Sequence, residues 1–548
     1  MAVTSPRNFA VLGLLLGITT HWGYFIRGEH HMAGPGILAA SFAGPLIILN
    51  VLLHFANVSS YHEAGVLTAI VTGAYVSGLI SSIVTYRLLF HRLGKFPGPF
   101  YLRITKWNHT WLLIFKGARN YQIVDEWHAK YGSIVRTGPN ELSITNPEAV
   151  AHILGSTSRC KKTGWYDCIN KPNKSLNLER DRVVHDARRK IWDRGFSTKA
   201  LRGYEGRVRK YTDQLVSQLN ANAGKPINAC KWFNYFAFDI MGDMAFGQSF
   251  GMVESGKEHS LISIMNKAMA ALGPLTPIIW ILPILKAIPG MAKPTWAFIN
   301  YNQDQVAKRK MYEPESPDLF SYFIDAEKND KNPMHRDLRW LVGDVGVIIV
   351  AGSDTTTSTL AYIFYHLAQS PHILRKLRDE LDAFYKPGSE SEFKDLQEAV
   401  YLNGVINESL RLHPPTPSGL QRLTPSEGMM IGSTFIPGRV TVSTPFWTLG
   451  RLEACYKHAK EFIPERWGSE AHMVIDKSVF LPFSTGPYGC VGKQLALMEL
   501  RSVTARIVSE FDVNFAPGED GSDLLEKSKD IFTLALAPLK LIFTRREG

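Results

Sequence analysis

The feature that most constrains this chain is a glycine-rich turn followed by a helical pattern, FSTGPYGCVGKQLALMELR, at residues 483–501. Gly486, Gly489 and Gly492 surround Cys490 there. Because glycine has no Cβ, such a turn can bend tightly and let its backbone approach a flat partner closely. The helical pattern begins immediately afterwards, where the helix dipole and free N–H groups lower the pKa of a thiol and favour the metal-binding thiolate.

The same turn also has a purely structural interpretation. A lone cysteine in a glycine-rich turn is more often a buried side chain than a metal ligand. The chain contains five cysteines in 548 residues, and an odd number leaves at least one unpaired. So few cysteines indicate a reducing compartment rather than a fold held by disulfides. At this point, metal ligation by Cys490 is one of two interpretations.

The amino-terminal part differs in composition from the rest. Residues 1–92 contain two acidic residues and no lysine. Three apolar stretches, 9–26, 37–56 and 64–86, lie near the length of about 20 residues that a bilayer crossing requires. The first could be a secretory signal peptide, but the apolar stretches that follow it and the lack of a convincing cleavage site favour retained anchors.

Basic residues after the third stretch predict the orientation. Arg87, Arg92 and Lys95 follow it closely, which by the positive-inside rule puts the rest of the chain on the cytoplasmic side. Three spans would then leave the amino terminus in the lumen. We expect a membrane anchor with up to three transmembrane helices at 1–92 and a folded domain at 93–548.

The pattern beyond the anchor predicts mostly α-helix with small β-sheets. Residues 133–145 suggest a hairpin, and Asn146 should cap a helix that follows it. Long helical patterns cover 338–370 and 403–413, and each ends at a proline. With 45% hydrophobic and 20% charged residues, the chain has ample material for a large core.

The net charge of +11 permits nucleic acid, a membrane surface or an acidic protein as a partner. The basic residues form no long run and no nucleic-acid-binding signature, so we expect no nucleic-acid binding.

The long helical pattern contains a segment that suits a helix poorly, AGSDTTTST at 351–359. Glycine and β-branched residues are poor helix formers, and threonine hydroxyls compete for backbone carbonyls. Such a conflict between propensity and pattern often marks a functional site. The alternative is a hydroxyl-rich helix face whose side chains bond back to their own carbonyls.

The cysteine loop resembles the haem-binding loop of the cytochrome P-450 family. The family pattern, Phe-x-x-Gly-x-(Arg or His)-x-Cys-x-Gly, is matched at Phe483, Gly486, Cys490 and Gly492. Tyr488 stands where the family usually has a basic residue that reaches a haem propionate, although tyrosine can still donate one hydrogen bond. Loops with tyrosine here are familiar in fungal members.

This resemblance implies a microsomal, fungal-type haem-thiolate protein with the cytochrome P-450 fold after the anchor. The cofactor would be haem b, iron protoporphyrin IX, with Cys490 as the axial ligand to the iron. The central helix is similar to the family motif (Ala/Gly)-Gly-x-(Asp/Glu)-Thr, which implies that Thr355 holds dioxygen and Asp354 helps to deliver protons. Cleaving dioxygen requires two protons on its outer oxygen, and a general-acid relay must supply them.

Glu408 and Arg411 lie three residues apart, on one face of the second helical pattern. Spacing alone favours a surface pair worth about 0.2–0.5 kcal/mol. The pair resembles the family's Glu-x-x-Arg element, and Arg466, in Pro-Glu-Arg-Trp, resembles its downstream partner. The resemblance therefore implies a buried triad that supports the haem loop.

Three further basic residues resemble the family's propionate contacts. His185 and Arg189 lie four residues apart in a predicted helix, and Arg422 follows shortly after the Glu-x-x-Arg helix. The alternative is a solvated basic face, which is the commoner origin of such a charge pattern.

The family's substrate-contacting segments would fall in mostly apolar parts of the chain. They are 160–178, the stretch around 268–280, 415–420 and 531–534, with Trp165, Trp280 and Phe532 as candidate pocket residues. Ligand pockets are mostly apolar, so we expect a small lipophilic substrate such as a terpenoid, sterol, fatty acid or aromatic metabolite.

By resemblance, the activity would be dioxygen-dependent hydroxylation or related oxidation, in fungal secondary metabolism, on the cytoplasmic face of the endoplasmic reticulum. The electron donor would be NADPH-cytochrome P-450 reductase, an acidic flavoprotein. One alternative is an oxygen-independent haem-thiolate isomerase or dehydratase, against which the Asp354-Thr355 pair counts. The other is a non-catalytic membrane haem protein, although the apolar stretches show no polar path.

Overall fold

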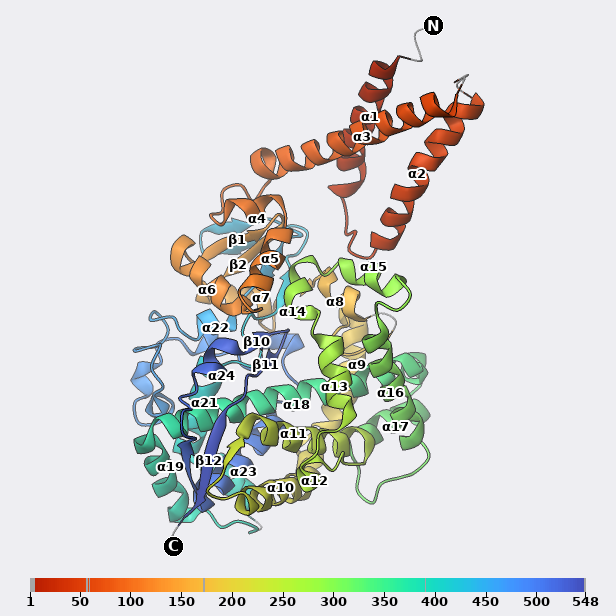
Figure 1. The fold of residues 1–548 in the computed structure, drawn as a ribbon. Helices are drawn as coiled ribbons and strands as arrows, with labels where there is room; N and C mark the ends of the chain where they lie inside the picture. The colour runs from red at the N-terminus through yellow and green to blue at the C-terminus, as the bar shows by residue number, and fades with distance from the viewer. Residues whose placement is uncertain (1–4, 56–57, 59, 171–172, 390, 547–548) are drawn as a thin grey trace.

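Three amino-terminal helices project from one end of a larger, mostly helical domain (Figure 1). The computed structural model describes residues 5–55, 58, 60–170, 173–389 and 391–546. The projecting helices are α1 (Pro6–Thr20), continued by a π-helical turn (His21–Phe25), α2 (Gly34–Phe55), and α3 (Tyr61–Thr85), continued by a second π-helical turn (Tyr86–Phe90). They correspond to the three apolar stretches of the sequence.

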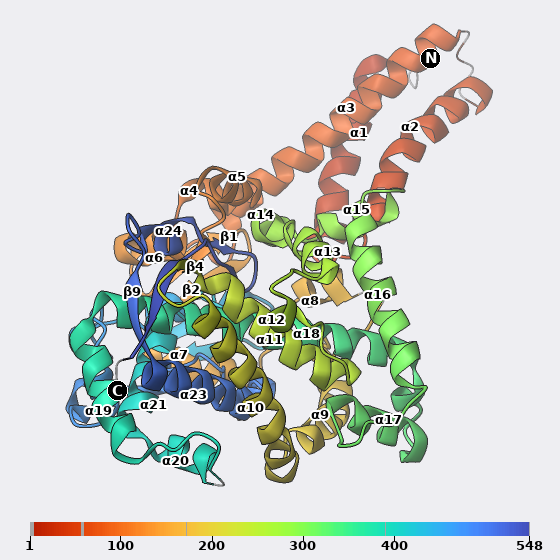
Figure 2. The ribbon, with the colours of Figure 1, turned by 60° about the horizontal axis from the view of Figure 1, so that its bottom comes forward.

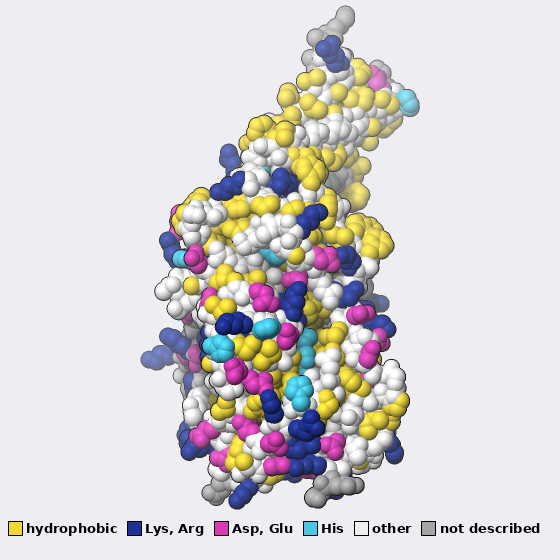
Figure 3. Space-filling model, turned by 90° about the vertical axis from the view of Figure 1, so that its left-hand side faces the viewer, with side chains coloured by type: hydrophobic (Ala, Val, Ile, Leu, Met, Phe, Trp, Pro, Cys, Tyr) yellow, Lys and Arg dark blue, Asp and Glu magenta, His cyan; other side chains and the backbone are white. Residues whose placement is uncertain are grey.

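Helices α1 and α3 pack closely because glycines line their contact. A Cβ added at Gly13, Gly17 or Gly78 would overlap a backbone carbonyl of the other helix. Small residues at such positions let two apolar helices approach each other without a polar interface. Hydrophobic side chains cover the outside of these helices, whereas charged side chains of both signs spread over the larger domain (Figure 3).

By length and composition, four helical segments of the described chain could cross a membrane: 34–55, 61–90, 260–278 and 338–369. The first two belong to the projecting helices and are mostly exposed. The segment 338–369 is instead a central helix of the larger domain, because 67% of its most apolar window is buried within the protein.

The larger domain is built around helix α18 (Leu338–Gln369), which ends one residue before the predicted limit. The other long helices are α6 (Asn120–Tyr131), α9 (Arg182–Gly195), α10 (Thr198–Ala221), α11 (Ala229–Phe246), α13 (Ser260–Met269), α16 (Lys293–Arg309), α17 (Leu319–Asn329), α19 (Pro371–Phe384), α21 (Val400–Leu412) and α23 (Lys493–Glu510). Shorter helices are α4 (Phe100–Ile104), α5 (Trp107–Phe115), α7 (Pro147–Leu154), α8 (Gly164–Asn170), α12 (Met252–Ser255), α14 (Leu272–Leu275), α15 (Ile281–Ala287), α20 (Glu392–Glu398), α22 (Phe446–Leu449) and α24 (Ser522–Lys527).

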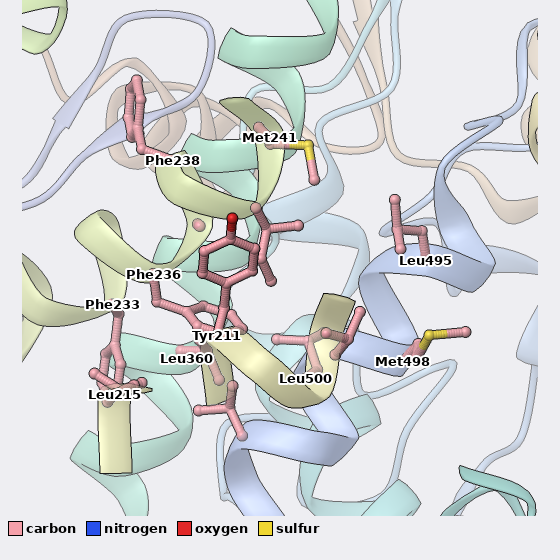
Figure 4. Close-up of a cluster of buried hydrophobic side chains, with 14 of the residues drawn as sticks. Tyr211, Leu215, Phe233, Phe236, Phe238, Met241, Leu360, Leu495, Met498 and Leu500 are labelled. Carbon is pink, nitrogen blue, oxygen red and sulfur yellow. The ribbon is translucent and has the colours of Figure 1, made fainter. Parts of the chain in front are cut away.

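The main core lies where α10, α11, α18 and α23 meet. Tyr211, Phe236, Leu360 and Leu500, one from each helix, are buried there in one cluster (Figure 4). Gly352 lets α18 approach α11, since a Cβ at this position would overlap the side chain of Met241. The glycine that suits a helix poorly therefore makes room for the Met241 side chain.

Within the described residues, four small sheets complete the fold. The largest has the order β1-β2-β8-β5-β3, formed by β1 (Ile134–Gly138), β2 (Glu141–Ile144), β8 (Thr441–Ser443), β5 (Gln421–Leu423) and β3 (Lys161–Lys162). The others pair β4 (Pro226–Asn228) and β9 (Phe511–Phe515) with β12 (Lys540–Arg545), β6 (Met429–Ile431) with β7 (Thr434–Ile436), and β10 (Lys529–Asp530) with β11 (Leu534–Ala535).

The secondary structure confirms the predicted fold class of mostly α-helix with small sheets. The hairpin in 133–145 is the β1–β2 pair, and the side chain of Asn146 caps α7 by accepting a hydrogen bond from the backbone. The helix predicted at 403–413 begins three residues earlier, at Val400.

Candidate active site

An interior cavity of about 540 Å³ lies between α8, α9, α16, α18 and the loop before α23. Its wall is mostly apolar and includes Trp165, Thr355, Cys490 and Phe532. The predicted cysteine loop and central-helix motif, which are far apart in sequence, therefore meet at one cavity.

The cysteine loop is held in shape by its own backbone. The N–H of Cys490 donates to the carbonyl of Phe483 at 2.8 Å. Gly486 has a φ of +68°, and a Cβ there would overlap the carbonyl of Leu154, so glycine is required at this position. Gly492 has an ordinary φ of −80° and lines the cavity beside the cysteine sulfur.

Cys490 is accessible although it lies deep inside the protein, because its accessible surface faces the cavity. Burial raises the pKa of its thiol, opposed by the N–H groups of Gly492 and Lys493 and by the charge of Arg189. The N–H groups at the start of the helix thus lower the pKa of the Cys490 thiol, as predicted. The pKa is nevertheless raised overall, because the effect of burial is larger than the effect of these groups. Metal coordination deprotonates a thiol outright, so this position still suits a metal ligand.

Cationic side chains surround Tyr488, the residue that departs from the family pattern. Lys162 Nζ lies 4.7 Å from the centre of its ring, and the guanidinium carbons of Arg422 and Arg182 lie at 5.0 and 5.8 Å. The ring of His185 meets it edge-on at 4.7 Å. We call these four side chains, together with Tyr488, the cation corner.

Two cations of this corner, Lys162 and Arg422, are buried with no carboxylate in direct contact among the described residues. Lys162 pairs with Arg422 across β3 and β5, and neither has an ion pair within the described chain. Lys162 Nζ donates to the carbonyls of Leu176 and Asn177, and Arg422 Nη1 donates to the hydroxyl of Tyr166. Arg422 Nε has no partner among the described residues. Burial, and then the charge of Arg422, lowers the pKa of Lys162 well below its usual value.

Buried cations without counter-ions cost free energy unless an anion joins them. Lys162, His185, Arg422 and Tyr488 all line the cavity that Cys490 faces. A haem group needs one thiolate and a site for its anionic propionates, so the residues present fit this group. Sequence analysis missed Lys162, because only the pairing of β3 with β5 distinguishes it from the exposed Lys161.

Helix α9 brings His185 and Arg189 to the cavity, as the resemblance implies, but in different surroundings. His185 is buried against Tyr488, and burial is the main reason that its pKa falls to about 4. Arg189 Nη1 donates to the carbonyl of Gly489 at 2.7 Å and so ties α9 to the cysteine loop.

The central-helix motif places Thr355 on the cavity wall and Asp354 behind it. Thr355 Oγ1 donates to the carbonyl of Ala351 at 2.7 Å, which is the back-bonding expected of a hydroxyl-rich helix face. Asp354 Oδ2 accepts from Thr533 Oγ1 at 3.2 Å, and Thr533 itself lines the cavity. Burial raises the pKa of Asp354 to about 7.

A second buried carboxyl reaches the cavity from α23. Glu499 Oε2 accepts from Thr356 Oγ1 at 2.9 Å, and its Oε1 has no partner in the described part of the chain. Burial raises the pKa of Glu499 to about 8. Sequence analysis missed this residue, although a single acidic residue inside the apolar pattern QLALMEL was a visible signal.

Glu408, Arg411 and Arg466 form a fully buried cluster, which we call the charged triad. Glu408 lies 2.7 Å from Arg411 and 2.8 Å from Arg466, and all three side chains have 0% exposure. The indole N–H of Trp467 also donates to Glu408. Trp467 packs against Phe480, 4.5 Å away between ring centres, just before the cysteine loop.

Comparison with known proteins decides the family. The sequence model of the cytochrome P-450 family matches residues 97–543. The chain belongs to the cytochrome P-450 family. Its relatives include cytochrome P-450 monooxygenase FCK2 of Fusarium pseudograminearum, 41% identical over 100% of this chain and 99% of the relative. Another is tryprostatin B 6-hydroxylase of Aspergillus fumigatus, 38% identical over 97% of this chain and 95% of the relative.

Membership of the cytochrome P-450 family makes this chain a haem-thiolate monooxygenase, an oxygenating oxidoreductase. The family uses dioxygen, a redox partner that supplies electrons, and a substrate. The relatives are fungal, as the tyrosine in the haem loop suggested. The apolar amino-terminal helices are compatible with membrane anchoring.

The four segments expected to contact substrate in this cytochrome P-450 all reach the cavity. One of the three candidate pocket residues does not. Trp165 and Phe532 line it, and their rings stack 5.1 Å apart. Trp280 was expected to do so as well, but it is 40% exposed and packs edge-on against Trp107. The prediction for Trp280 was wrong, because this residue lies in the turn just before α15, where the sequence does not give the direction of a side chain.

Proposed function

We propose that this protein is a membrane-anchored monooxygenase that holds haem b through Cys490 and oxidises a small lipophilic substrate in fungal secondary metabolism. The observation that carries the proposal is the position of Cys490 and the cation corner on one cavity. The thiolate and the propionate sites that haem requires are both present there.

The cofactor would be held at two places. Cys490 would supply the sulfur ligand, Lys162 and Arg422 would supply positive charge and hydrogen bonds to the propionates, and His185, neutral because its pKa is about 4, would supply a hydrogen bond. Bound in this way, haem supplies iron that activates dioxygen, with electron density pushed toward the metal by the thiolate. Tyr488 orients the cations through its ring, and Arg189 fixes the loop through the carbonyl of Gly489.

Asp354, Thr533 and Thr355 would manage protons at the cavity. Because the pKa of Asp354 is about 7, its carboxyl holds and releases a proton near neutral pH, and Thr533 Oγ1 connects it to the cavity wall. The hydroxyl proton of Thr355 is directed to Ala351, so its oxygen lone pairs are free to accept a hydrogen bond from the cavity. Glu499 provides a second protonated carboxyl behind Thr356.

The substrate proposed is a terpenoid or aromatic molecule, and the reaction is hydroxylation or a related oxidation. The apolar wall and the stacked pair Trp165–Phe532 would bind a flat, apolar surface. Two relatives are named tryprostatin B 6-hydroxylase, which supports hydroxylation as the reaction.

We place the anchor at 1–92 and the catalytic domain at 93–548, on the cytoplasmic face of the endoplasmic reticulum. Leu93 and Phe96 are buried in the core of the larger domain, which supports this boundary. The electron donor proposed is NADPH-cytochrome P-450 reductase, which the net charge of +11 would attract as an acidic partner.

Replacing Cys490 with alanine tests the proposal. We expect purified C490A to lose the carbon monoxide difference spectrum of a thiolate-bound haem, and C455A, which removes another buried cysteine, to keep it. An unchanged spectrum in C490A would overturn the assignment. NADPH-dependent oxygen uptake with the reductase, and mass spectrometry of products from terpenoid and aromatic substrates, then test the activity against an oxygen-independent rearrangement.

A further inference from the structure

The turn between the first two anchor helices lies against the larger domain rather than free in solvent. We call residues 26–33, between the first π-helical turn and α2, the anchor turn. In both ribbon views, the end of α2 nearest this turn lies beside α15, and α8 lies just below (Figures 1 and 2). The other end of α2 points away from the domain.

Polar contacts join the anchor turn to α8 and the segment after it. Arg180 Nη2 donates to both carboxylate oxygens of Glu29, at 2.9 and 2.8 Å. His31 Nε2 lies 2.8 Å from Asp167 Oδ2, and Arg180 Nη1 also donates to Asp167. Although burial raises the pKa of Asp167, the hydrogen bonds from His31 and Arg180 bring it below its usual value, so this carboxylate is charged at neutral pH.

Apolar contacts complete the attachment. Met32 packs against the buried cluster that contains Trp165 and Tyr166. The ring of His31 lies so close to Gly164 that a Cβ there would overlap it, and a Cβ at Gly34 would lie 2.9 Å from the side chain of Ile284 on α15. The chain from the anchor turn to the start of α2 therefore touches both α8 and α15.

These two helices are also walls of the cavity. Trp165, Tyr166 and Ile169 line it from α8, and Leu282 and Leu285 line it from α15. The chain from the anchor turn to the start of α2 therefore contacts the side of α8 and α15 that faces away from the cavity, and other side chains of these two helices line the cavity. Each ion pair is partly exposed and weak alone, but the three pairs together bind the anchor turn to α8 and the segment after it, while Gly34, at the start of α2, packs against α15.

We propose that the anchor turn, together with the start of α2, is a positioning element of the substrate cavity: the turn holds α8, the start of α2 holds α15, and their release widens the path by which large ligands enter. The proposal rests on the proposed function only in taking this cavity as the ligand site. A membrane anchor that served only to tether the domain would not need contacts to two cavity walls.

The first test measures hydrogen exchange in the full-length protein with Glu29→Gln and His31→Ala combined. The matched control is Glu126→Gln, which breaks the exposed Lys116–Glu126 pair elsewhere on the domain. We expect amide exchange in residues 164–170 to speed up by about three- to fivefold in the double variant and to stay unchanged in the control. Unchanged exchange in 164–170 would overturn the proposal, and this readout does not depend on haem ligation or turnover.

The second test compares two haem ligands of different size in the same variants. We expect the association rate of a bulky azole to rise about threefold and that of imidazole to stay the same, because only the large ligand needs the walls to part. Equal changes for both ligands would mean that the variants perturb the haem and not the path. Should the double variant be poorly folded, Glu29→Gln alone provides the milder version, with a smaller expected change in the same direction.

Discussion

The charged triad and the pair Lys162–Arg422 of the cation corner are both clusters of buried charge, but they differ in how completely the charges are paired. Glu408 accepts hydrogen bonds from Arg411, Arg466, Trp467 and the backbone of Ile463. In the cation corner, Lys162 has only backbone carbonyls as hydrogen-bond acceptors within the described chain.

This difference separates structural support from a ligand site. A buried ion pair with complete hydrogen bonding is satisfied inside the protein, and removing one member leaves a charge without its partner. Buried cations without counter-ions are unfavourable until an anion arrives, so their free energy is recovered on ligand binding rather than on folding. The degree of pairing, and not burial alone, supports the proposal that the cation corner and not the charged triad faces the cofactor.

The largest effect should come from the charged triad. Replacing Glu408 with glutamine removes the carboxylate that neutralises two buried arginines, and we expect the free energy of unfolding to fall by about 3–5 kcal/mol. Denaturant unfolding of the detergent-solubilised protein measures this. Glu427→Gln breaks the exposed pair with Arg159 and should cost less than about 1 kcal/mol. Equal effects for the two variants would remove the contrast between the triad and a surface pair.

Glu499 is a buried glutamate with no cationic partner among the described residues, so its replacement should act in the opposite direction. Its pKa of about 8 in the folded protein lies above the usual 4.5, so folding keeps it protonated. Below about pH 4.5 the carboxyl is protonated in both the folded and the unfolded state, so its raised pKa has no effect on stability. As the pH rises from about 4.5 to about 8, the carboxyl ionises in the unfolded state but not in the folded state, and the free energy of unfolding falls.

We therefore expect Glu499→Gln to stabilise the protein by roughly 2–4 kcal/mol at pH 8 and to have little effect at pH 4.5. The glutamine can still accept the hydrogen bond from Thr356. Unfolding measured at both pH values checks this, and a loss of stability at pH 8 would mean that Glu499 is paired like Glu408.

The sequence predicts the parts of the site that are local in the chain. The cysteine loop and the central-helix motif are contiguous patterns, and a 3.6-residue period was enough to place α18 to within one residue. Lys162 could not be found in this way, because its inward direction depends on pairing with Arg422, far along the chain. Trp280 was placed wrongly because it lies in the turn just before α15, and apolarity alone does not give the direction of a side chain in a turn.

The third prediction concerns the cation corner itself. Replacing Lys162 with methionine keeps the length and removes a charge, and we expect haem to dissociate about tenfold faster, the value of one charge-assisted contact. Transfer of haem to an acceptor globin measures the rate. Lys161→Met is the matched control, because this neighbour points outward from the same strand. Similar rates for both variants would mean that Lys162 does not face the propionates.

The smallest effect is expected from removing the hydroxyl of Tyr488, the residue that departs from the family pattern. Its ring contacts Lys162 and Arg422, so Tyr488→Phe keeps the contacts that orient the cations and loses one hydroxyl. We expect haem to dissociate about twofold faster in this variant, and about tenfold faster in Tyr488→Ala, which loses the ring as well. If Tyr488→Phe were as severe as Tyr488→Ala, the hydroxyl would be the essential contact, and tyrosine would replace the family's basic residue directly. If only the alanine variant is severe, the neighbouring cations have taken over that residue's charge, and tyrosine holds them in position.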